Sequence, residues 1–277
     1  MKHDTERPSR RARARMSQET VKILEAGCYH GPDGVVELEA LLVSAVAGTT
    51  EYPPGVRPAL DESPSRSTCF TVENTTTLDA AEPLARAAQA RGAPPPLMLN
   101  FASAKSPGGG FLNGAIAQEE SLAACSGLYA CLKGQPMYAH HRAQRDPMYT
   151  DYAIYSPSVP VFRADRGALL AEPYLCACVT APAVNAGAAR KRVSDAVIET
   201  AMAERVEKVL RIAAHHGHSD IVLGAWGCGA FRNSPEMIAR CFADVLHGPL
   251  QGWFEHVCFA VLDWGHEIIS PFEQRFT

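Results

Sequence analysis

The chain has 277 residues, of which 47% are hydrophobic and 20% are charged, as expected for a folded protein with a substantial core. Its formal net charge of −4 provides no basic field for general duplex DNA binding, and no run of 18 apolar residues is present for a membrane span. The nine cysteines are odd in number and scattered, without a Cys-x-x-Cys pair, which argues against a disulfide scaffold and a structural zinc site. We expect reduced, buried thiols in a cytoplasmic protein that binds neither a metal nor a cofactor.

Composition divides the chain into three parts. Residues 1–16 hold five arginines among small polar residues and are expected to form a flexible tail. Residues 17–66 are predicted to form an accessory extension, with a helix over 17–26 that ends at Gly27, short strands near 35–36 and 41–43, and a proline-rich extended segment. Residues 67–277 are predicted to form the main domain.

In the main domain, strands and helices alternate. Strands are predicted over 67–74, 97–101, 152–156, 159–163, 174–180, 221–223 and 257–262. Helices are predicted over 78–91, 118–132, 190–216 and 235–246, whereas residues 133–150 are polar and expected to be irregular. This alternation predicts an α/β layered domain.

Two glycine-rich loops each lie between a buried strand and a helix. The first contains Gly108-Gly109-Gly110, and the second runs over residues 224–233. Ligands of open α/β folds bind beyond the carboxyl ends of strands, and glycine lets backbone N–H groups approach a phosphate closely. The loops therefore predict a diphosphate site, although glycine turns after strands are common. Neither loop matches the P-loop or the dinucleotide fingerprint, which argues against an ATPase and an NAD-dependent dehydrogenase.

Glu119 and Glu120 begin the helix that follows the first loop. They could simply complement the helix dipole. Adjacent helical residues point about 100° apart, so the pair cannot face each other across a scissile bond as the two carboxylates of most glycosidases do. In a glycosidase, one of them would transfer the proton and the other would hold the sugar, and the substrate would supply the second catalytic group.

The two loops carry a family resemblance. Gly108-Gly109-Gly110, seven further residues and Gln118-Glu119-Glu120 resemble the signature of poly(ADP-ribose) glycohydrolases. The stretch from Trp226 to Phe231 resembles their diphosphate loop, and the wider chain resembles the microbial branch. The resemblance implies a macrodomain-like three-layer α/β/α sandwich with a mixed central sheet and an N-terminal helical extension.

The resemblance also implies an activity and a set of site residues. The expected reaction is hydrolysis of the ribose–ribose O-glycosidic bonds of poly(ADP-ribose) with release of ADP-ribose. Glu120 would be the general acid and base, Glu119 would bind the ribose being cleaved, and the substrate diphosphate would assist. The residues expected to bind substrate are Glu73 (at the adenine), Asn100, Ser103, Gly108, Gly109, Gly110, Gln118, Gly227, Cys228, Gly229, Ala230 and Phe231.

Some positions depart from the animal-type pattern. Ser103 stands where an asparagine is expected, and the last strand lacks the ribose-capping Phe, for which Leu262 or Trp264 could substitute. A non-catalytic ADP-ribose-binding module and a hydrolase of mono-ADP-ribosylated proteins are the alternatives. The expected partners are poly(ADP-ribose), ADP-ribosylated proteins and the product ADP-ribose, without specific nucleic-acid binding or a membrane. The protein is expected to be a monomer that acts in the DNA damage response.

Overall fold

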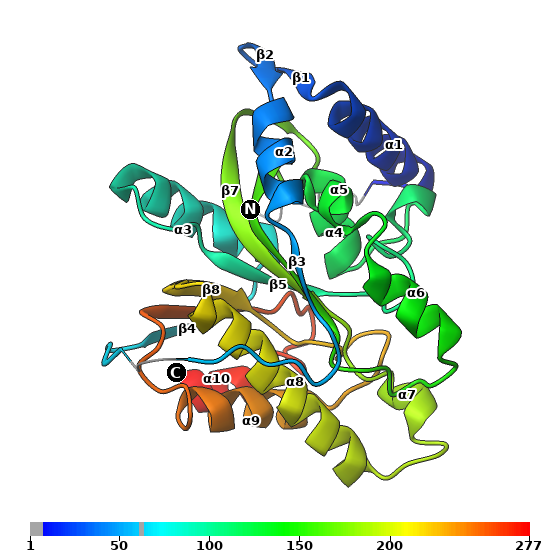
Figure 1. The fold of residues 1–277 in the computed structure, drawn as a ribbon, viewed down its shortest axis with the longest axis vertical. Coiled ribbons are helices and arrows are strands. Elements are labelled where there is room, and N and C mark those ends of the chain that lie inside the picture. The colour runs from blue at the N-terminus through cyan, green and yellow to red at the C-terminus, as the bar shows by residue number, and fades with distance from the viewer. Residues whose placement is uncertain (1–7, 61–63) are drawn as a thin grey trace.

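The computed structural model describes residues 8–60 and 64–277. At its centre lies a seven-stranded sheet in the order β3-β6-β7-β5-β8-β9-β4 (Figure 1). Its strands are β3 (Thr50–Tyr52), β4 (Cys69–Glu73), β5 (Leu97–Phe101), β6 (Ala153–Arg163), β7 (Leu169–Ala181), β8 (Asp220–Leu223) and β9 (His256–Ala260). The sheet is mixed, because β6 is antiparallel to β3 and β7 whereas the other pairings are parallel.

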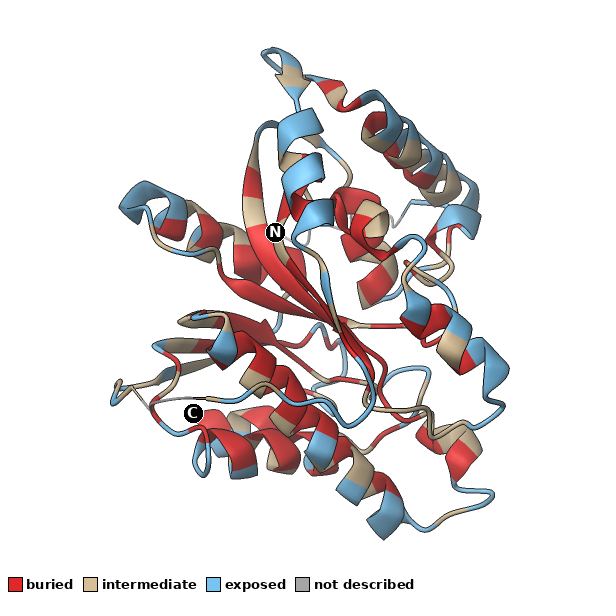
Figure 2. Ribbon diagram, in the orientation of Figure 1, coloured by how far each residue is buried: buried red, intermediate tan, exposed pale blue. Residues whose placement is uncertain are grey.

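Helices cover both faces of this sheet. One face packs against α8 (Asp195–His215), α9 (Pro235–Leu246) and α10 (Ser270–Phe276), and the other against α3 (Thr77–Arg91), α4 (Gln118–Cys125) and α5 (Leu128–Leu132). Alternate residues of β5 point to opposite faces of the sheet. Leu97 and Leu99 pack in the core under α8 and α9, and Met98 packs in the core under α3, α4 and α5. Figure 2 shows the buried residues along the strands and the inner sides of these helices. The three layers confirm the predicted α/β/α fold with a mixed sheet.

The sheet order determines where the two glycine loops lie. Strands β4, β9, β8, β5 and β7 are parallel, so their carboxyl ends meet at one edge of the sheet. The loop after β5 carries Gly108-Gly109-Gly110, and the loop after β8 carries residues 224–234. They approach each other at this edge because β5 and β8 are neighbours in the sheet.

Several segments differ from the sequence prediction. The helix expected over 118–132 is divided into α4 and α5, and the strands expected over 152–156 and 159–163 form the single strand β6. A helix, α2 (Glu39–Ala47), replaces the strand expected near 41–43, because the buried side chains of Leu38, Leu42 and Ala45 follow helical spacing. Another helix, α6 (Pro136–Ala143), lies within the stretch expected to be irregular, and it buries Met137, Tyr138 and His141.

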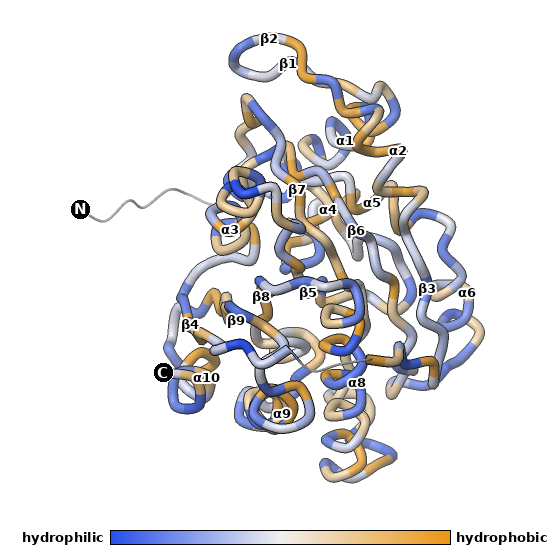
Figure 3. Tube along the Cα trace, turned by 60° about the vertical axis from the view of Figure 1, so that its left-hand side comes forward, coloured by the Kyte–Doolittle hydropathy of each residue, from blue (hydrophilic) through white to orange (hydrophobic). Residues whose placement is uncertain are grey.

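The N-terminal region is more ordered than predicted. Helix α1 (Arg10–Ala26) begins after a Ser9 cap and ends at Gly27, which has a φ of 70°. Residues 10–16, expected in a flexible tail, are therefore helical, and residues 1–7 of that tail lie outside the described residues. The hairpin of β1 (Cys28–Gly31) and β2 (Gly34–Glu37) follows α1, at the end of the molecule away from α9 and α10 (Figure 3).

Strand β3 belongs to the segment predicted as an accessory extension, yet it forms an edge of the central sheet by pairing with β6. None of the described helices has the length and apolar composition needed to cross a lipid bilayer.

Candidate active site

Gln118 connects the first turn of α4 to the end of β5. Its Oε1 accepts a hydrogen bond from the backbone N–H of Phe101 at 2.9 Å. Its Nε2 donates to the backbone oxygen of Leu99 at 2.7 Å and to Thr77 Oγ1 at 3.2 Å. Because both ends of the amide are bonded within the protein, Gln118 holds the start of α4 against the sheet and thereby positions the two glutamates that follow it.

Glu119 is buried, with 3% of its surface exposed. Its Oε2 accepts a hydrogen bond from the backbone N–H of Ser103 at 2.6 Å, and the fully buried Asn100 lies 3.5 Å from its Oε1 through Nδ2. Burial raises the pKa of Glu119 to about 8, and the charge of Glu120 adds to the effect, although the bond from Ser103 opposes it. Burial therefore favours the neutral carboxylic acid of Glu119 at pH 7.

Glu120 is half-buried, and its Oε1 accepts a hydrogen bond from the backbone N–H of Gly110 at 2.8 Å. Gly109 has a φ of 60°, which favours glycine. A Cβ built on Gly109 would overlap Glu120 Oε1 and lie 3.0 Å from Glu119 Oε2. Both carboxyl groups therefore converge on the backbone of Gly109, and only a residue without a side chain fits there.

The backbone N–H groups of this first loop bond to protein oxygens. Gly108 donates to Glu119, Gly109 donates to the carbonyl oxygen of Ser106 at 3.0 Å, and Gly110 donates to Glu120. Gly108 has a φ of 70° and packs against Phe111. The first loop thus orients the two glutamates.

The second loop is fixed to the sheet through Trp226 and is exposed at its tip. Trp226 is fully buried, and its Nε1 donates to the backbone oxygen of Ala181 at 3.2 Å. Gly227 has a φ of 75°, and a Cβ there would collide with Asn233 and Ala183. The residues at the tip are Gly229, Ala230 and Phe231.

The tip of this loop presents unused donors. Gly229 and Ala230 are exposed, and a Cβ on Gly229 would meet nothing within 4 Å. Within residues 8–60 and 64–277, the backbone N–H groups of Gly229, Ala230 and Phe231 donate to no protein acceptor. Three consecutive backbone N–H groups without protein acceptors among these residues are suited to phosphate oxygens.

The remaining predicted residues lie around the same edge. Glu73 is exposed at the end of β4, at the opposite side of the sheet from β6. The Phe231 ring lies 6.0 Å from that of Tyr149, centroid to centroid. Burial raises the pKa of Cys228 to about 12, so this thiol is not a nucleophile at neutral pH.

Sequence reasoning missed Asp263, which organises the loop after β9. Its carboxylate accepts hydrogen bonds from the backbone N–H groups of Gly265 at 3.0 Å, Ile268 at 2.6 Å and Ile269 at 3.1 Å. Its neighbours Leu262 and Trp264 are 48% and 79% exposed. A lone aspartate after a strand is a common turn residue, so the sequence held no signal for this role.

The sequence pattern of the catalytic domain of microbial-type PARG, the poly(ADP-ribose) glycohydrolase family, matches residues 17–164. The chain belongs to this family. The fold is similar to that of the poly(ADP-ribose) glycohydrolase (PARG) of Thermomonospora curvata, with 45% sequence identity, a TM-score of 0.88 and coverage of 96% of this chain and 100% of that chain. A structure of the T. curvata enzyme bound to the inhibitor ADP-HPD matches with the same identity and coverage and a TM-score of 0.87.

The PARG of Deinococcus radiodurans in complex with ADP-ribose is also similar, with 40% identity and a TM-score of 0.75 over 84% of this chain and 96% of that chain. No curated protein matches the chain. The microbial-type PARG pattern begins at residue 17, so the first two turns of α1 precede it.

Proposed function

We propose that the chain is a glycosidase that hydrolyses the ribose–ribose O-glycosidic bonds of poly(ADP-ribose) and releases ADP-ribose. The observation that carries this proposal is the convergence of Glu119 and Glu120 on Gly109, together with a neighbouring loop whose three N–H groups at the tip donate to no acceptor among the described residues. Identities of 40–45% to glycohydrolases over most of the chain support the same activity.

The order of the strands supports one direction for the bound substrate. Glu73, at the end of β4, accepts a hydrogen bond from the adenine amino group. The N–H groups of Gly229, Ala230 and Phe231, after β8, bind the diphosphate. The distal ribose then reaches Glu119 and Glu120, whose helix follows β5. Because the sheet order is β4-β9-β8-β5, these contacts follow the sequence of groups in ADP-ribose.

Glu120 acts as the general acid in this proposal. It is the more exposed of the two carboxyls, and its Oε1 is held by Gly110. It protonates the oxygen of the departing ribose and then removes a proton from the attacking water. The diphosphate of the substrate stabilises the positive charge that develops on the ribose ring, which is the role of the second carboxylate in other glycosidases.

Glu119 binds the ribose in its neutral form. A protonated carboxyl group can donate a hydrogen bond to a ribose hydroxyl, which a carboxylate cannot do. Its neutrality also avoids the repulsion of two adjacent negative charges that would oppose binding of a diphosphate. A binding module without catalysis would need the second loop but would gain nothing from a buried acid at this position.

The test compares the wild-type protein with Glu120→Gln. Purified poly(ADP-ribose) is incubated with each, and released ADP-ribose is followed by chromatography. We expect the variant to lose ~10²- to 10⁴-fold in rate while it still binds ADP-ribose in calorimetry. Binding without release by the wild type would instead indicate a reader or an enzyme for another linkage, which mono-ADP-ribosylated proteins would test.

The raised pKa of Glu119 makes a second assignment testable. If Glu119 were the acid, Glu119→Gln would abolish release, and the wild-type rate would fall as pH rises above about 8. We expect Glu119→Gln to weaken substrate binding and Glu120→Gln to remove the chemical step.

A further inference from the structure

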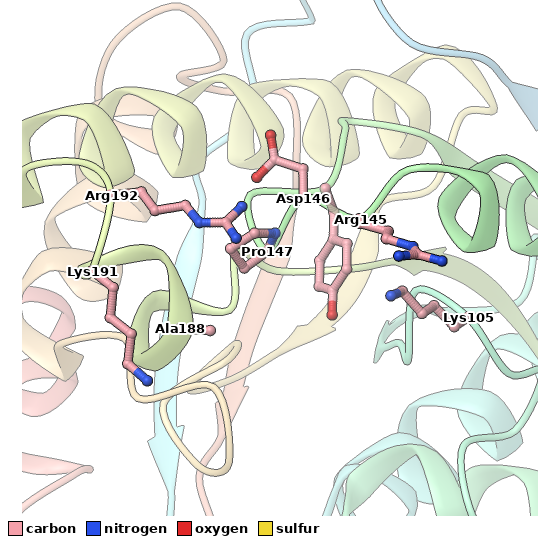
Figure 4. Close-up of a pocket in the computed structure, with 8 residues that line it drawn as sticks. Lys105, Arg145, Asp146, Pro147, Ala188, Lys191 and Arg192 are labelled. Carbon is pink, nitrogen blue, oxygen red and sulfur yellow. The ribbon is translucent and has the colours of Figure 1, made fainter.

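A pocket of about 280 Å³ lies beside the loop that leads to the two glutamates. It is lined by Lys105, Arg145, Asp146, Tyr149, Lys191 and Arg192, among others. Figure 4 shows Lys105 and Arg145 on one side of the pocket and Lys191 and Arg192 on the other. Four cationic side chains from three separate segments thus surround one cavity, against a single carboxylate.

Throughout the part of the chain that the structure describes, none of Lys105, Arg145, Lys191 and Arg192 takes part in an ion pair. The carboxylate of Asp146 accepts a hydrogen bond from the backbone N–H of Met148 at 2.9 Å. Four positive charges against one carboxylate produce a net positive potential, which attracts an anion.

The pocket is connected to the active site on two sides. Arg142 donates through NH1 to the backbone oxygen of Lys105 at 2.7 Å, which joins the end of α6 to the glycine-loop segment. On the other side, the Tyr149 ring lies against Phe231, whose backbone oxygen accepts a hydrogen bond from the N–H of Gly187 at 3.0 Å. An anion in the pocket would therefore lie next to the proposed diphosphate loop.

The sheet order tells which end of the substrate reaches this pocket. Lys191 and Arg192 follow β7, and Arg145 and Tyr149 precede β6. In the sheet, β7 and β6 lie beyond β5 on the side away from β4. A substrate with its adenine at Glu73 and its distal ribose at Glu120 therefore continues toward the pocket after the scissile bond.

We propose that this pocket binds the diphosphate of the ADP-ribose unit on the far side of the scissile bond. The proposal rests on the proposed function and assigns a second anion site to it. Each ADP-ribose unit of the polymer carries two phosphates, so the leaving part of the chain brings a diphosphate of its own. A volume of about 280 Å³ lies below the range of sites for drug-sized ligands and suits a diphosphate better than a whole nucleotide.

The test uses two substrates with the same scissile bond. The first is ADP-ribosyl-ADP-ribose, and the second is synthetic ADP-ribosyl-adenosine, which keeps the ribose–ribose bond but lacks the second diphosphate. The pocket variant is Lys191→Ala/Arg192→Ala, and Arg145→Ala provides an independent change. The matched control is Lys22→Ala/Arg275→Ala, which removes the same charge from two exposed residues on α1 and α10, which do not line the pocket.

We expect wild type to prefer ADP-ribosyl-ADP-ribose. The pocket double variant should raise the KM for this substrate ~10-fold at 50 mM salt, which is a few-fold per cation removed. For ADP-ribosyl-adenosine, its kcat/KM should stay within about twofold of wild type. The difference between variant and wild type should shrink at 0.5 M salt, since salt screens exposed charges. The control variant should match wild type on both substrates.

Equal losses on the two substrates, or no loss on either, would overturn the pocket assignment while leaving the hydrolase in place. If wild type cleaves neither substrate, the proposed function itself fails. A single-stranded DNA oligomer tests whether the pocket binds nucleic acid instead. If the pocket variant loses affinity for DNA but keeps the wild-type preference between the two substrates, the pocket is a nucleic-acid surface and the proposal is wrong.

Discussion

Glu119 and Glu120 are adjacent carboxylic acids in different surroundings. The rotation of about 100° between successive helical residues turns Glu119 under the sheet edge, where Ser103 and Asn100 contact it. The same rotation leaves Glu120 half-exposed on Gly110. Environment alone therefore gives one residue a pKa near 8 and leaves the other at the surface, which is how enzymes assign separate roles to paired carboxyls.

The raised pKa of Glu119 makes stability depend on pH. The native chain keeps the proton between pH 4.5 and about 8, where an unfolded chain has released it. The stabilising contribution is thus complete below pH 4.5 and is lost as pH rises through about 8. The free energy of unfolding should fall by at most ~1.4 kcal/mol per pH unit across this window.

Urea unfolding at several pH values measures this dependence. Glu119→Gln, which cannot ionise, should show a flatter profile than wild type and higher stability at pH 9. Glu120→Gln is the matched control and should retain the wild-type slope. Identical slopes in all three proteins would show that Glu119 is ionised in the native state.

At Gly109, the two neighbouring glutamates leave no room for a side chain. We expect Gly109→Ala to lose activity ~100-fold or more, because the new Cβ displaces Glu120 and crowds Glu119. The left-handed backbone adds a cost of ~1 kcal/mol to folding. Gly217→Ala, which has a similar left-handed backbone (φ of 74°) but introduces a Cβ into open space, is the control and should retain wild-type cleavage. Thermal unfolding and polymer cleavage separate the two effects.

At the scale of elements, α1 lies against the loop that carries the glycine motif. Arg10 Nε donates to the backbone oxygen of Asn113 at 3.0 Å, and Arg13 Nε donates to that of Gly114 at 2.9 Å. Gly114 has a φ of 70°, and a Cβ there would overlap the backbone of Arg10. The segment expected to be a flexible tail thus braces the short 3₁₀ turn Phe111–Asn113 that separates the glycines from α4.

Removing these two bonds should loosen the glycine loop. We expect Arg10→Ala/Arg13→Ala to lower kcat for polymer cleavage several-fold and to cost ~1–2 kcal/mol of stability, about 1 kcal/mol per bond. Arg11→Ala/Arg15→Ala, on the exposed face of the same helix, should match wild type. A variant that loses stability but keeps the wild-type kcat would show that α1 supports the fold without positioning the loop.

At the scale of the molecule, the sheet joins distant parts of the chain. Both neighbours of β5, β7 and β8, come after it in sequence, and both lie entirely beyond the residues 17–164 that the family pattern matches. A fragment of residues 17–164 would leave both sides of β5 unpaired and one face of the sheet without α8 and α9. We expect this fragment to be unfolded by circular dichroism and unable to bind ADP-ribose, whereas the full chain unfolds cooperatively. A cooperative transition of the fragment would contradict this view.

The sequence by itself determined the elements with strong local signals and the identity of the motifs. Strand β5 and helix α9 have the predicted bounds, because the apolar run and the Pro235 start are local features. The α/β class, the two loops and the glutamate pair were likewise evident, since each depends on residues close together in the chain.

Only the tertiary structure decided what depends on distant partners. The short apolar run of α2 is ambiguous between helix and strand until packing against β6 selects the helix. The neutral state of Glu119 arises from burial and contacts across β5, and the brace of Arg10 and Arg13 joins residues about 100 positions apart. The four cations that line the pocket, Lys105, Arg145, Lys191 and Arg192, are scattered over nearly 90 residues of sequence, so only the folded chain brings their charges together.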